Sequence, residues 1–264
     1  MSGSSEARGA KRLVAVAGKG GTGKTACVAM MTRVLTENGD GGKLLLIDAD
    51  PAGGLQSALG TKVRRTMGEV REAVIRTAKG DDQQAKAELA DKVEYLAFEA
   101  LTEVDGYALL AMGRTETMGC YCPVNSLLRG AIASLSKSFD TILIDGEAGL
   151  EQVNRQVVKH VDTLIVVSDP TTRGIETAAV IKRMVEVDKA MKCERLGLLF
   201  NRVQGNHRAL EESAASIGMD VFGMIPYDDN VADFDFHGKP ITGLPDDSPS
   251  VGAYRAVIER HVLA

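Results

Sequence analysis

Short apolar runs alternate along the chain with longer amphipathic stretches. Each run is almost continuously apolar and ends at Gly, Asp, Asn or Pro, which is typical of parallel strands buried on both faces. The expected strands are Leu13–Ala17, Leu44–Ile47, Val93–Ala97, Thr141–Ile144, Thr163–Val167, Leu196–Phe200 and Val221–Ile225. The expected helices between them are Ala26–Glu37, Thr66–Thr77, Asn125–Lys137, Glu151–Val161 and Gly174–Ala190. This alternation predicts right-handed βαβ units and an α/β fold, a doubly wound, mainly parallel sheet with helices on both faces.

The composition indicates one folded domain. The 264 residues are 44% apolar and 25% charged, which is enough to bury a full core and excludes wholesale disorder. The sequence has no Pro/Ser-rich linker, so we expect a single domain over residues 13–264. Residues 1–12 are small, polar and basic, and we expect them to form a flexible tail. No segment approaches the roughly 20 apolar residues of a membrane span. We therefore expect a cytoplasmic protein with no membrane partner.

The charge balance disfavours nucleic acid as a partner. Lys and Arg total 31 against 36 Asp and Glu, a net charge of -5, whereas proteins that hold nucleic acid by charge alone are basic. Aromatic residues are sparse, with 6 Phe, 5 Tyr and no Trp, so stacking platforms for single strands are disfavoured as well. Four cysteines are too few for a disulfide scaffold, but reduced thiols can serve as metal ligands.

A glycine-rich segment follows the first expected strand and precedes the first expected helix. It fits the phosphate-loop pattern G-x-x-x-x-G-K-[ST] of P-loop NTPases, although a flexible glycine turn is the simpler alternative. The glycines let successive backbone N–H groups face phosphate oxygens, and the helix start adds its positive dipole end. We expect Lys24 to reach the β- and γ-phosphates of ATP and the Thr25 hydroxyl to bind Mg²⁺. The segment comprises Gly18, Lys19, Gly20, Gly21, Thr22, Gly23, Lys24 and Thr25.

The additional lysine after the first glycine, Lys19, narrows the choice among families that share this phosphate-loop pattern. This stretch resembles the deviant Walker A group of P-loop ATPases, which includes cell-division siting and plasmid-partition proteins, the nitrogenase iron protein and metal-insertion ATPases. The resemblance implies that Lys19 crosses a two-fold interface to the partner's nucleotide, and therefore that ATP is bound by a homodimer. A solvated loop lysine is the plainer alternative.

Three aspartates follow expected strands where that group needs them. Asp48 and Asp50, at positions i and i+2, leave a strand end toward the same side and resemble the first switch. The resemblance implies that Asp50 orients the attacking water and that Asp48 binds the magnesium shell through water. Capping of a helix near Pro51 is the structural alternative. Asp145 ends a strand that resembles a Walker B strand and would hold Mg²⁺.

A later pair of segments is similar to the base-binding part of the family. Asn201 and Arg202 follow the expected strand Leu196–Phe200, and the Asn201 amide offers a donor and an acceptor for the adenine edge. Pro226 fits the loop packed near the base. Asparagine at a strand end is also ordinary turn chemistry, so both interpretations stay open.

Cys120 and Cys122 form a closely spaced thiol pair. In an extended segment, residues i and i+2 project to one side, so both thiolates can meet one ion. A two-fold axis at this loop would supply four thiolates, which suit Zn²⁺ in a tetrahedron and Ni²⁺ in a plane. An incidental pair is the alternative, because C-x-C alone is a weak motif. Cys27 and Cys193 are expected to be small buried hydrophobes.

The phosphate loop, the switch aspartates, the cysteine pair and Glu147-Ala148-Gly149 together resemble the CooC-type ATPases, from Val14 to about Tyr227. These proteins insert nickel into carbon monoxide dehydrogenase. The resemblance implies that Cys120 and Cys122 of each subunit bind one metal ion at the dimer interface. ATP binding would close the dimer, and hydrolysis would release the ion to the client enzyme.

Two other functions remain open. An iron–sulfur reductase related to the nitrogenase iron protein would need a cysteine shortly after Asp145, and residues 149–153 contain none. A partition or positioning ATPase scaffold that binds membranes would need a basic amphipathic helix near residues 250–262. That segment has an apolar stripe but few basic residues, so we expect it to dock on the sheet instead.

Overall fold

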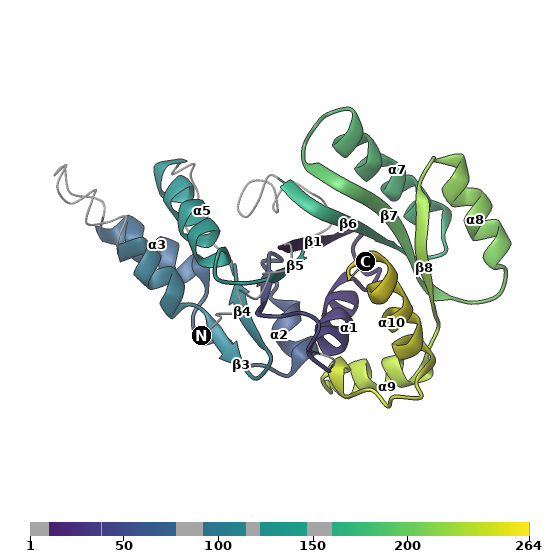
Figure 1. Cartoon of the computed structure of the whole chain (residues 1–264), viewed down its shortest axis with the longest axis horizontal. Helices are drawn as coiled ribbons and strands as arrows, with labels where there is room; N and C mark the ends of the chain where they lie inside the picture. Colours follow the sequence, from purple (N-terminus) through teal and green to yellow (C-terminus); the bar gives the residue numbers. More distant parts are fainter. Residues whose placement is uncertain (1–10, 38, 78–91, 115–121, 147–159, 264) are drawn as a thin grey trace, which may run out of the picture.

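The computed structural model describes residues 11–37, 39–77, 92–114, 122–146 and 160–263. Within these residues the strands form one eight-stranded sheet with the order β3-β4-β2-β5-β1-β6-β7-β8 (Figure 1). Neighbouring strands are parallel except for β3 and β4, which confirms the predicted doubly wound, mainly parallel arrangement. The strands are β1 (Arg12–Ala17), β2 (Leu44–Asp48), β3 (Thr102–Val104), β4 (Tyr107–Ala111), β5 (Thr141–Asp145), β6 (His160–Ser168), β7 (Lys192–Val203) and β8 (Asp220–Pro226).

Helices cover both faces of the sheet. On one face, side chains of α1 and α10 pack with alternate strand residues such as Leu44 and Leu46. On the other face, side chains of α3, α5, α7 and α8 belong to the core cluster that also contains Leu45 and Ile47. In Figure 1, α1 and α10 lie on one side of strands β6 to β8, and α7 and α8 lie on the other. The helices are α1 (Lys24–Glu37), α2 (Gly54–Leu59), α3 (Met67–Thr77), α5 (Cys122–Ser136), α7 (Thr172–Glu186), α8 (His207–Ser216), α9 (Asp229–Phe236), the 3-10 turn η1 (Ile241–Gly243) and α10 (Pro249–His261).

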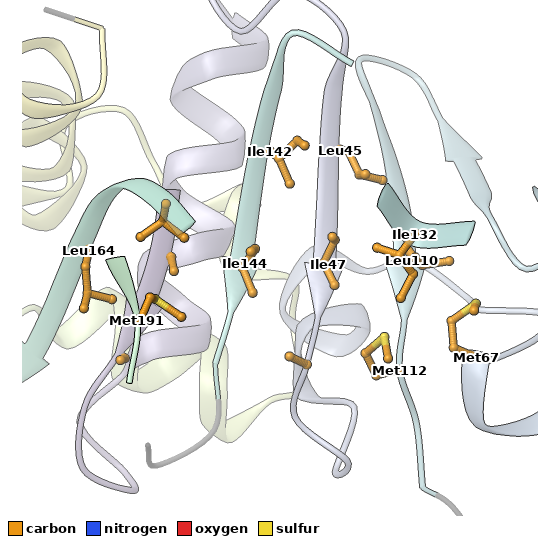
Figure 2. Close-up of a cluster of buried hydrophobic side chains, with 14 of the residues drawn as sticks. Leu45, Ile47, Met67, Leu110, Met112, Ile132, Ile142, Ile144, Leu164 and Met191 are labelled. Atoms are coloured by element: carbon orange, nitrogen blue, oxygen red, sulfur yellow. The ribbon is translucent and has the colours of Figure 1, made fainter. Parts of the chain in front are cut away.

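The central strands explain why the sequence shows continuous apolar runs. All five residues of β2 and of β5 are buried, because each strand is covered on both faces. Figure 2 shows Leu45 and Ile47 of β2 beside Ile142 and Ile144 of β5, in the layer that also contains Leu110, Met112 and Ile132. This double burial fixes the register of the strands, and with it the position of the residues that follow them.

The prediction of a strand at Val93–Ala97 is wrong, because residues 92–99 form a helix. Val93, Ala97 and Ala100 are buried at helical spacing, whereas Tyr95 and Phe98 are exposed. The apolar run is short, and period alone does not separate a helix from a strand at this length. The sequence interpretation also missed the hairpin of β3 and β4, which turns at Asp105-Gly106, where Gly106 has φ of +85°.

The remaining expected elements agree with the structure where it describes them. Helix α10 docks as expected, with Val251, Tyr254, Val257 and Ile258 buried in the cluster that contains α1. The helix expected at Glu151–Val161 lies outside the described residues except for its last two positions, which belong to β6. Of the expected tail over residues 1–12, only Lys11 and Arg12 are described, and Arg12 begins β1.

Gly197 provides a test of the packing between β7 and β8. A Cβ atom at Gly197 would lie 2.2 Å from ring atoms of Phe222, and that ring stacks on His261 with centroids 4.1 Å apart. We expect Gly197→Ala to lower the free energy of unfolding by about 1–3 kcal/mol, measured by urea denaturation, because the confined ring must shift.

The matched control is Gly252→Ala in α10, where an added Cβ meets no atom within 4 Å. This variant should be neutral or up to about 1 kcal/mol more stable, since alanine favours helices over glycine. Equal stability of the two variants would contradict the packing argument.

Candidate functional site

The phosphate loop is held in place by two glycines that have no room for a side chain. Gly18 has φ of +144°, and a Cβ there would lie 2.1 Å from the carbonyl oxygen of Val167 in β6. Gly23 has φ of +93°, and its Cβ would lie 2.2 Å from Nδ2 of Asn201 in β7. The loop is therefore clamped against the carboxyl ends of two strands, and α1 starts at its last two residues, Lys24 and Thr25. The first N–H groups of a helix lack intrahelical partners and suit anions, so this helix start can bind phosphate.

The two lysines of the loop have different surroundings. Lys24 is nearly buried, and its Nζ donates a hydrogen bond to the carbonyl oxygen of Lys19 at 3.1 Å. The Lys19 side chain is about one-third exposed and forms an ion pair with Asp169, N to O 3.6 Å, in the segment after β6. Thr171 in the same segment accepts a hydrogen bond from the Gly174 N–H and so caps α7. Within one chain, the Lys19 side chain is thus directed toward Asp169, whereas the Lys24 ammonium group lies against the backbone of the phosphate loop.

Two buried aspartates stand side by side at the strand ends. Asp48 of β2 and Asp145 of β5 are paired in the parallel ladder, and both side chains are essentially inaccessible to solvent. Asp48 accepts hydrogen bonds from the backbone N–H groups of Asp50 and Leu55, each at 3.2 Å. Among the described residues no hydrogen bond of ordinary geometry reaches either carboxylate oxygen of Asp145, although the Thr25 hydroxyl lies close enough to act on this group. The pair therefore concentrates negative charge beside the start of α1.

The protonation of this pair reflects its burial. Desolvation raises the pKa of Asp145 to about 7; the Thr25 hydroxyl and the Lys24 ammonium act to lower this pKa, and Asp48 and Asp50 act to raise it. Desolvation also raises the pKa of Asp48 to about 6, against the hydrogen bonds from Leu55 and Asp50. Two buried carboxylates next to a threonine hydroxyl are a hard oxygen donor set, which fits Mg²⁺.

Asp50 lies at the rim of the site. Its side chain accepts a hydrogen bond from the N–H of Ala52 at 2.8 Å, so it also shapes the turn before α2. The capping alternative thus describes part of the local structure, since Asp48 also accepts the Leu55 N–H in the first turn of α2. Gly53, the residue before α2, makes no side-chain cap.

A cavity with a volume of about 950 Å³ opens beside the phosphate loop. Asn201 Nδ2 donates to the carbonyl oxygen of Thr22 at 2.8 Å, and its Oδ1 accepts the Arg202 N–H at 3.0 Å. The Asn201 amide therefore braces the loop and keeps one N–H and one lone pair beyond these two bonds. The cavity walls include Gly20, Gly21, Gly23, Lys24, Thr25, Asp50, Asn201, Arg202 and Pro226.

The sequence interpretation missed a buried polar cluster in the wall of this cavity. Asp228 follows β8 and accepts hydrogen bonds from the hydroxyls of Ser248 and Ser250 and from the N–H of Asn230. Burial acts to raise the pKa of Asp228, but these hydrogen bonds outweigh it and hold the pKa below its usual value. The cluster fixes the starts of α9 and α10 against the strand end. A sequence signal existed in the helix caps at Asp228 and at Ser248-Pro249.

The cysteine pair falls mostly outside the described residues. Cys122 is the first residue of α5, whereas Cys120 and the segment Glu147-Ala148-Gly149 are not described. Cys27 is buried within the core cluster that contains α1, and burial raises its pKa strongly. Cys193 is partly buried, and burial raises its pKa as well. These two thiols suit packing and not metal binding.

Comparison with known proteins identifies the family. A family model described as the CobQ/CobB/MinD/ParA nucleotide binding domain matches residues 13–241. The chain belongs to this family. ATP and Mg²⁺ are the ligands expected of P-loop ATPases in the CobQ/CobB/MinD/ParA family, in agreement with the phosphate loop and the aspartate pair. The broader resemblance drawn from the phosphate loop is therefore confirmed.

Individual relatives cover most of the chain. An uncharacterized ATP-binding protein of Methanocaldococcus jannaschii is 35% identical over 237 residues, which is 89% of this chain and 92% of the relative. The carbon monoxide dehydrogenase accessory protein CooC of Rhodospirillum rubrum is 34% identical over 181 residues, 64% of this chain and 67% of CooC. The structure of the septum site-determining protein MinD from Pyrococcus horikoshii, complexed with Mg-ADP, has a TM-score of 0.69 at 22% identity over 96% of this chain and 99% of MinD. This structural match shows the fold.

No helix in the described part of the chain is both long and apolar enough to span a bilayer.

The aspartate pair gives a prediction for stability against pH. Both folded-state pKa values lie above the ordinary value of 3.8, so ionisation disfavours the folded state. Without Mg²⁺ and nucleotide, these groups should add stability as the pH falls from about 7 towards 4. We expect Asp145→Asn to raise the free energy of unfolding at pH 8 by on the order of 2 kcal/mol, measured by denaturant unfolding.

Asp105→Asn is the control, because Asp105 lies exposed in the hairpin turn. It should change stability by less than about 0.5 kcal/mol. An Asp145→Asn variant no more stable than wild type at pH 8 would show that the buried pair carries no such electrostatic cost.

Proposed function

We propose that this chain is a Mg²⁺-dependent ATPase, formed by one domain over residues 13–264, that acts as a nucleotide-driven switch and carries a metal ion for delivery. The observation that carries the ATPase part is the pair Asp48 and Asp145, buried side by side next to Lys24 and Thr25. Buried like charges of this kind are costly unless a cation offsets them. The neighbouring cavity, with a volume of about 950 Å³, is large enough for a nucleotide.

The residues around the cavity divide the work of phosphoryl transfer between them. Gly20 to Gly23 and the start of α1 bind the phosphates, and Lys24 compensates their charge. Thr25, Asp48 and Asp145 would hold Mg²⁺, which offsets phosphate charge when bound. Asp50, at the cavity wall, orients the attacking water. Asn201, Arg202 and Pro226 form the wall on the side of the base. Phosphoryl transfer at such a site rests mostly on positioning and charge stabilisation, and the bound nucleotide then acts as a conformational switch with slow turnover.

Dimerisation would complete the site. Lys19 has enough exposure and length to leave Asp169, and an exposed ion pair at 3.6 Å is weak. We infer that ATP draws Lys19 of one protomer to the phosphates of its partner, as the deviant Walker A resemblance implies. The two-chain species then depends on ATP.

The proposed cargo is a soft metal ion, with nickel favoured and zinc as the alternative. The support comes from the similarity to CooC, an accessory protein of carbon monoxide dehydrogenase, over 181 residues. Cys122 is the first residue of α5, and Cys120 comes two positions earlier in the sequence. Two copies of the pair supply four thiolates. Carbon monoxide dehydrogenase or a related nickel enzyme is the client that this similarity suggests.

Lys19 gives the test of the switch. We expect Lys19→Gln to bind ATP within a few-fold of wild type but to stay a single chain with ATP, because the charge that reaches the partner is gone. Lys24→Gln should lose ATP affinity at least about 10-fold. The measurements are nucleotide titration and sedimentation velocity.

The exposed Lys62 provides the control, and Lys62→Gln should behave as wild type in both measurements. If Lys19→Gln sediments with ATP as the same two-chain species as wild type, the proposed role of Lys19 in trans is rejected.

The cysteine pair gives the test of the cargo. In an anaerobic nickel or zinc titration followed by ultraviolet thiolate–metal absorbance, we expect about one thiolate-bound ion per two chains. This signal should be lost in Cys120→Ala/Cys122→Ala and kept in the control Cys27→Ala/Cys193→Ala. ATP binding should survive in both double variants. Unchanged metal binding in the first variant would reject the cargo site, and iron–sulfur absorbance in the purified wild type would favour a reductase instead.

A further inference from the structure

A histidine and two carboxylates gather at the amino-terminal edge of the sheet. His160 begins β6, Asp162 lies two residues later, and Glu194 lies on the neighbouring strand β7. The ladder pairs Val161 with Cys193 and Thr163 with Arg195, so Asp162 and Glu194 stand next to each other between these pairs. The phosphate loop lies against Val167, at the other end of β6. This cluster is therefore separate from the nucleotide site.

The three side chains lie on one face of the sheet. Positions i and i+2 of a strand share a face, which places His160 and Asp162 together. Val161 and Cys193, at the intervening positions, pack instead against the core cluster that contains α7 side chains. The two strands thus present an imidazole and two carboxylates as one group.

The spacing of the group is slightly wider than that of ligands around a bound ion. The imidazole nitrogens lie 4.0 Å from Asp162 and 3.9 Å from Glu194, too far for hydrogen bonds. One ligand atom from each residue falls within 4.8 Å of the others. Two ligands of a tetrahedral zinc ion, each at about 2.1 Å, are about 3.4 Å apart. His160 and Glu194 are at least half exposed, so small rotations close the difference.

One ligand is already fixed in place. Asp162 Oδ2 accepts a hydrogen bond from the backbone N–H of Leu13 in β1 at 2.7 Å, which leaves Oδ1 on the side of His160. Such an outer hydrogen bond orients a carboxylate before a metal arrives. Two neighbouring carboxylates also repel each other, and a divalent cation between them removes that repulsion. Lys192 stands opposite His160 but is exposed, so its ammonium group can turn away.

We propose that His160, Asp162 and Glu194 form a binding site for a divalent transition-metal ion of the zinc class, distinct from the nucleotide-bound Mg²⁺ and from the cysteine pair. One imidazole and two carboxylates supply three ligands, and the open side leaves room for water. A bound ion links β6 and β7 directly and β1 through Leu13. The site stands whether or not the cysteine pair carries a cargo.

Zinc titration tests the site in the full chain without nucleotide or Mg²⁺, in a background of Cys120→Ala/Cys122→Ala/Cys193→Ala that removes these thiols as competing ligands. Competition with a chromophoric chelator should give one Zn²⁺ per chain. His160→Ala, Asp162→Asn and Glu194→Gln should each weaken binding at least about 10-fold. Asp162→Asn keeps an oxygen for the Leu13 N–H, so the fold is preserved. The imidazole ¹⁵N resonances of His160 should shift on addition of Zn²⁺.

His237→Ala is the matched control, because His237 also faces a carboxylate, with Nδ1 3.0 Å from Asp233, but belongs to no group of three such ligands among the described residues. It should bind Zn²⁺ as the parent does. Unchanged zinc affinity in the combined His160, Asp162 and Glu194 variant overturns the proposal, as does an equal loss in His237→Ala. Failure of the cysteine cargo test leaves this result unaffected, because the background already lacks those thiols.

Discussion

The parallel pairing of β2 with β5 is the constraint on which the site depends. The ladder places Asp48 beside Asp145 in the same row, and the strands cannot slip because both faces of each are buried. Two carboxylates in such surroundings repel each other and resist ionisation, as their raised pKa values show. The apolar core offsets this cost. The sheet therefore holds ready two carboxylates whose ionised form a bound cation favours.

The phosphate loop depends on the same sheet in a different way. Gly18 and Gly23 touch β6 and β7 so closely that no other residue fits, and Asn201 ties the loop to the end of β7. The loop is therefore not a flexible segment that orders around a ligand. It is a rigid edge of the fold, and the freedom left in the site lies in side chains at its rim, such as Lys19 and Asp50.

The sequence predicted well those features that depend on neighbours along the chain. The phosphate loop and the fully buried strands are local patterns, and the structure has them where they were expected. The segment Val93–Ala97 is wrongly predicted as a strand, because five residues carry no clear period. The helical spacing of the buried Val93, Ala97 and Ala100 becomes visible only once the fold is known. The Asp228 cluster and the ion pair of Lys19 with Asp169 join residues 20 or more positions apart. Such pairings are set by tertiary packing and leave little trace in one sequence.

The bond from Asn201 to Thr22 has a consequence for synthesis of the protein. It joins residues 179 positions apart, so the segment that shapes the loop leaves the ribosome long after the loop itself. Until β7 has emerged and packed, a nascent chain carries the glycine-rich motif without its brace. Nucleotide affinity should therefore arise late in translation, when more than three-quarters of the 264 residues have been made.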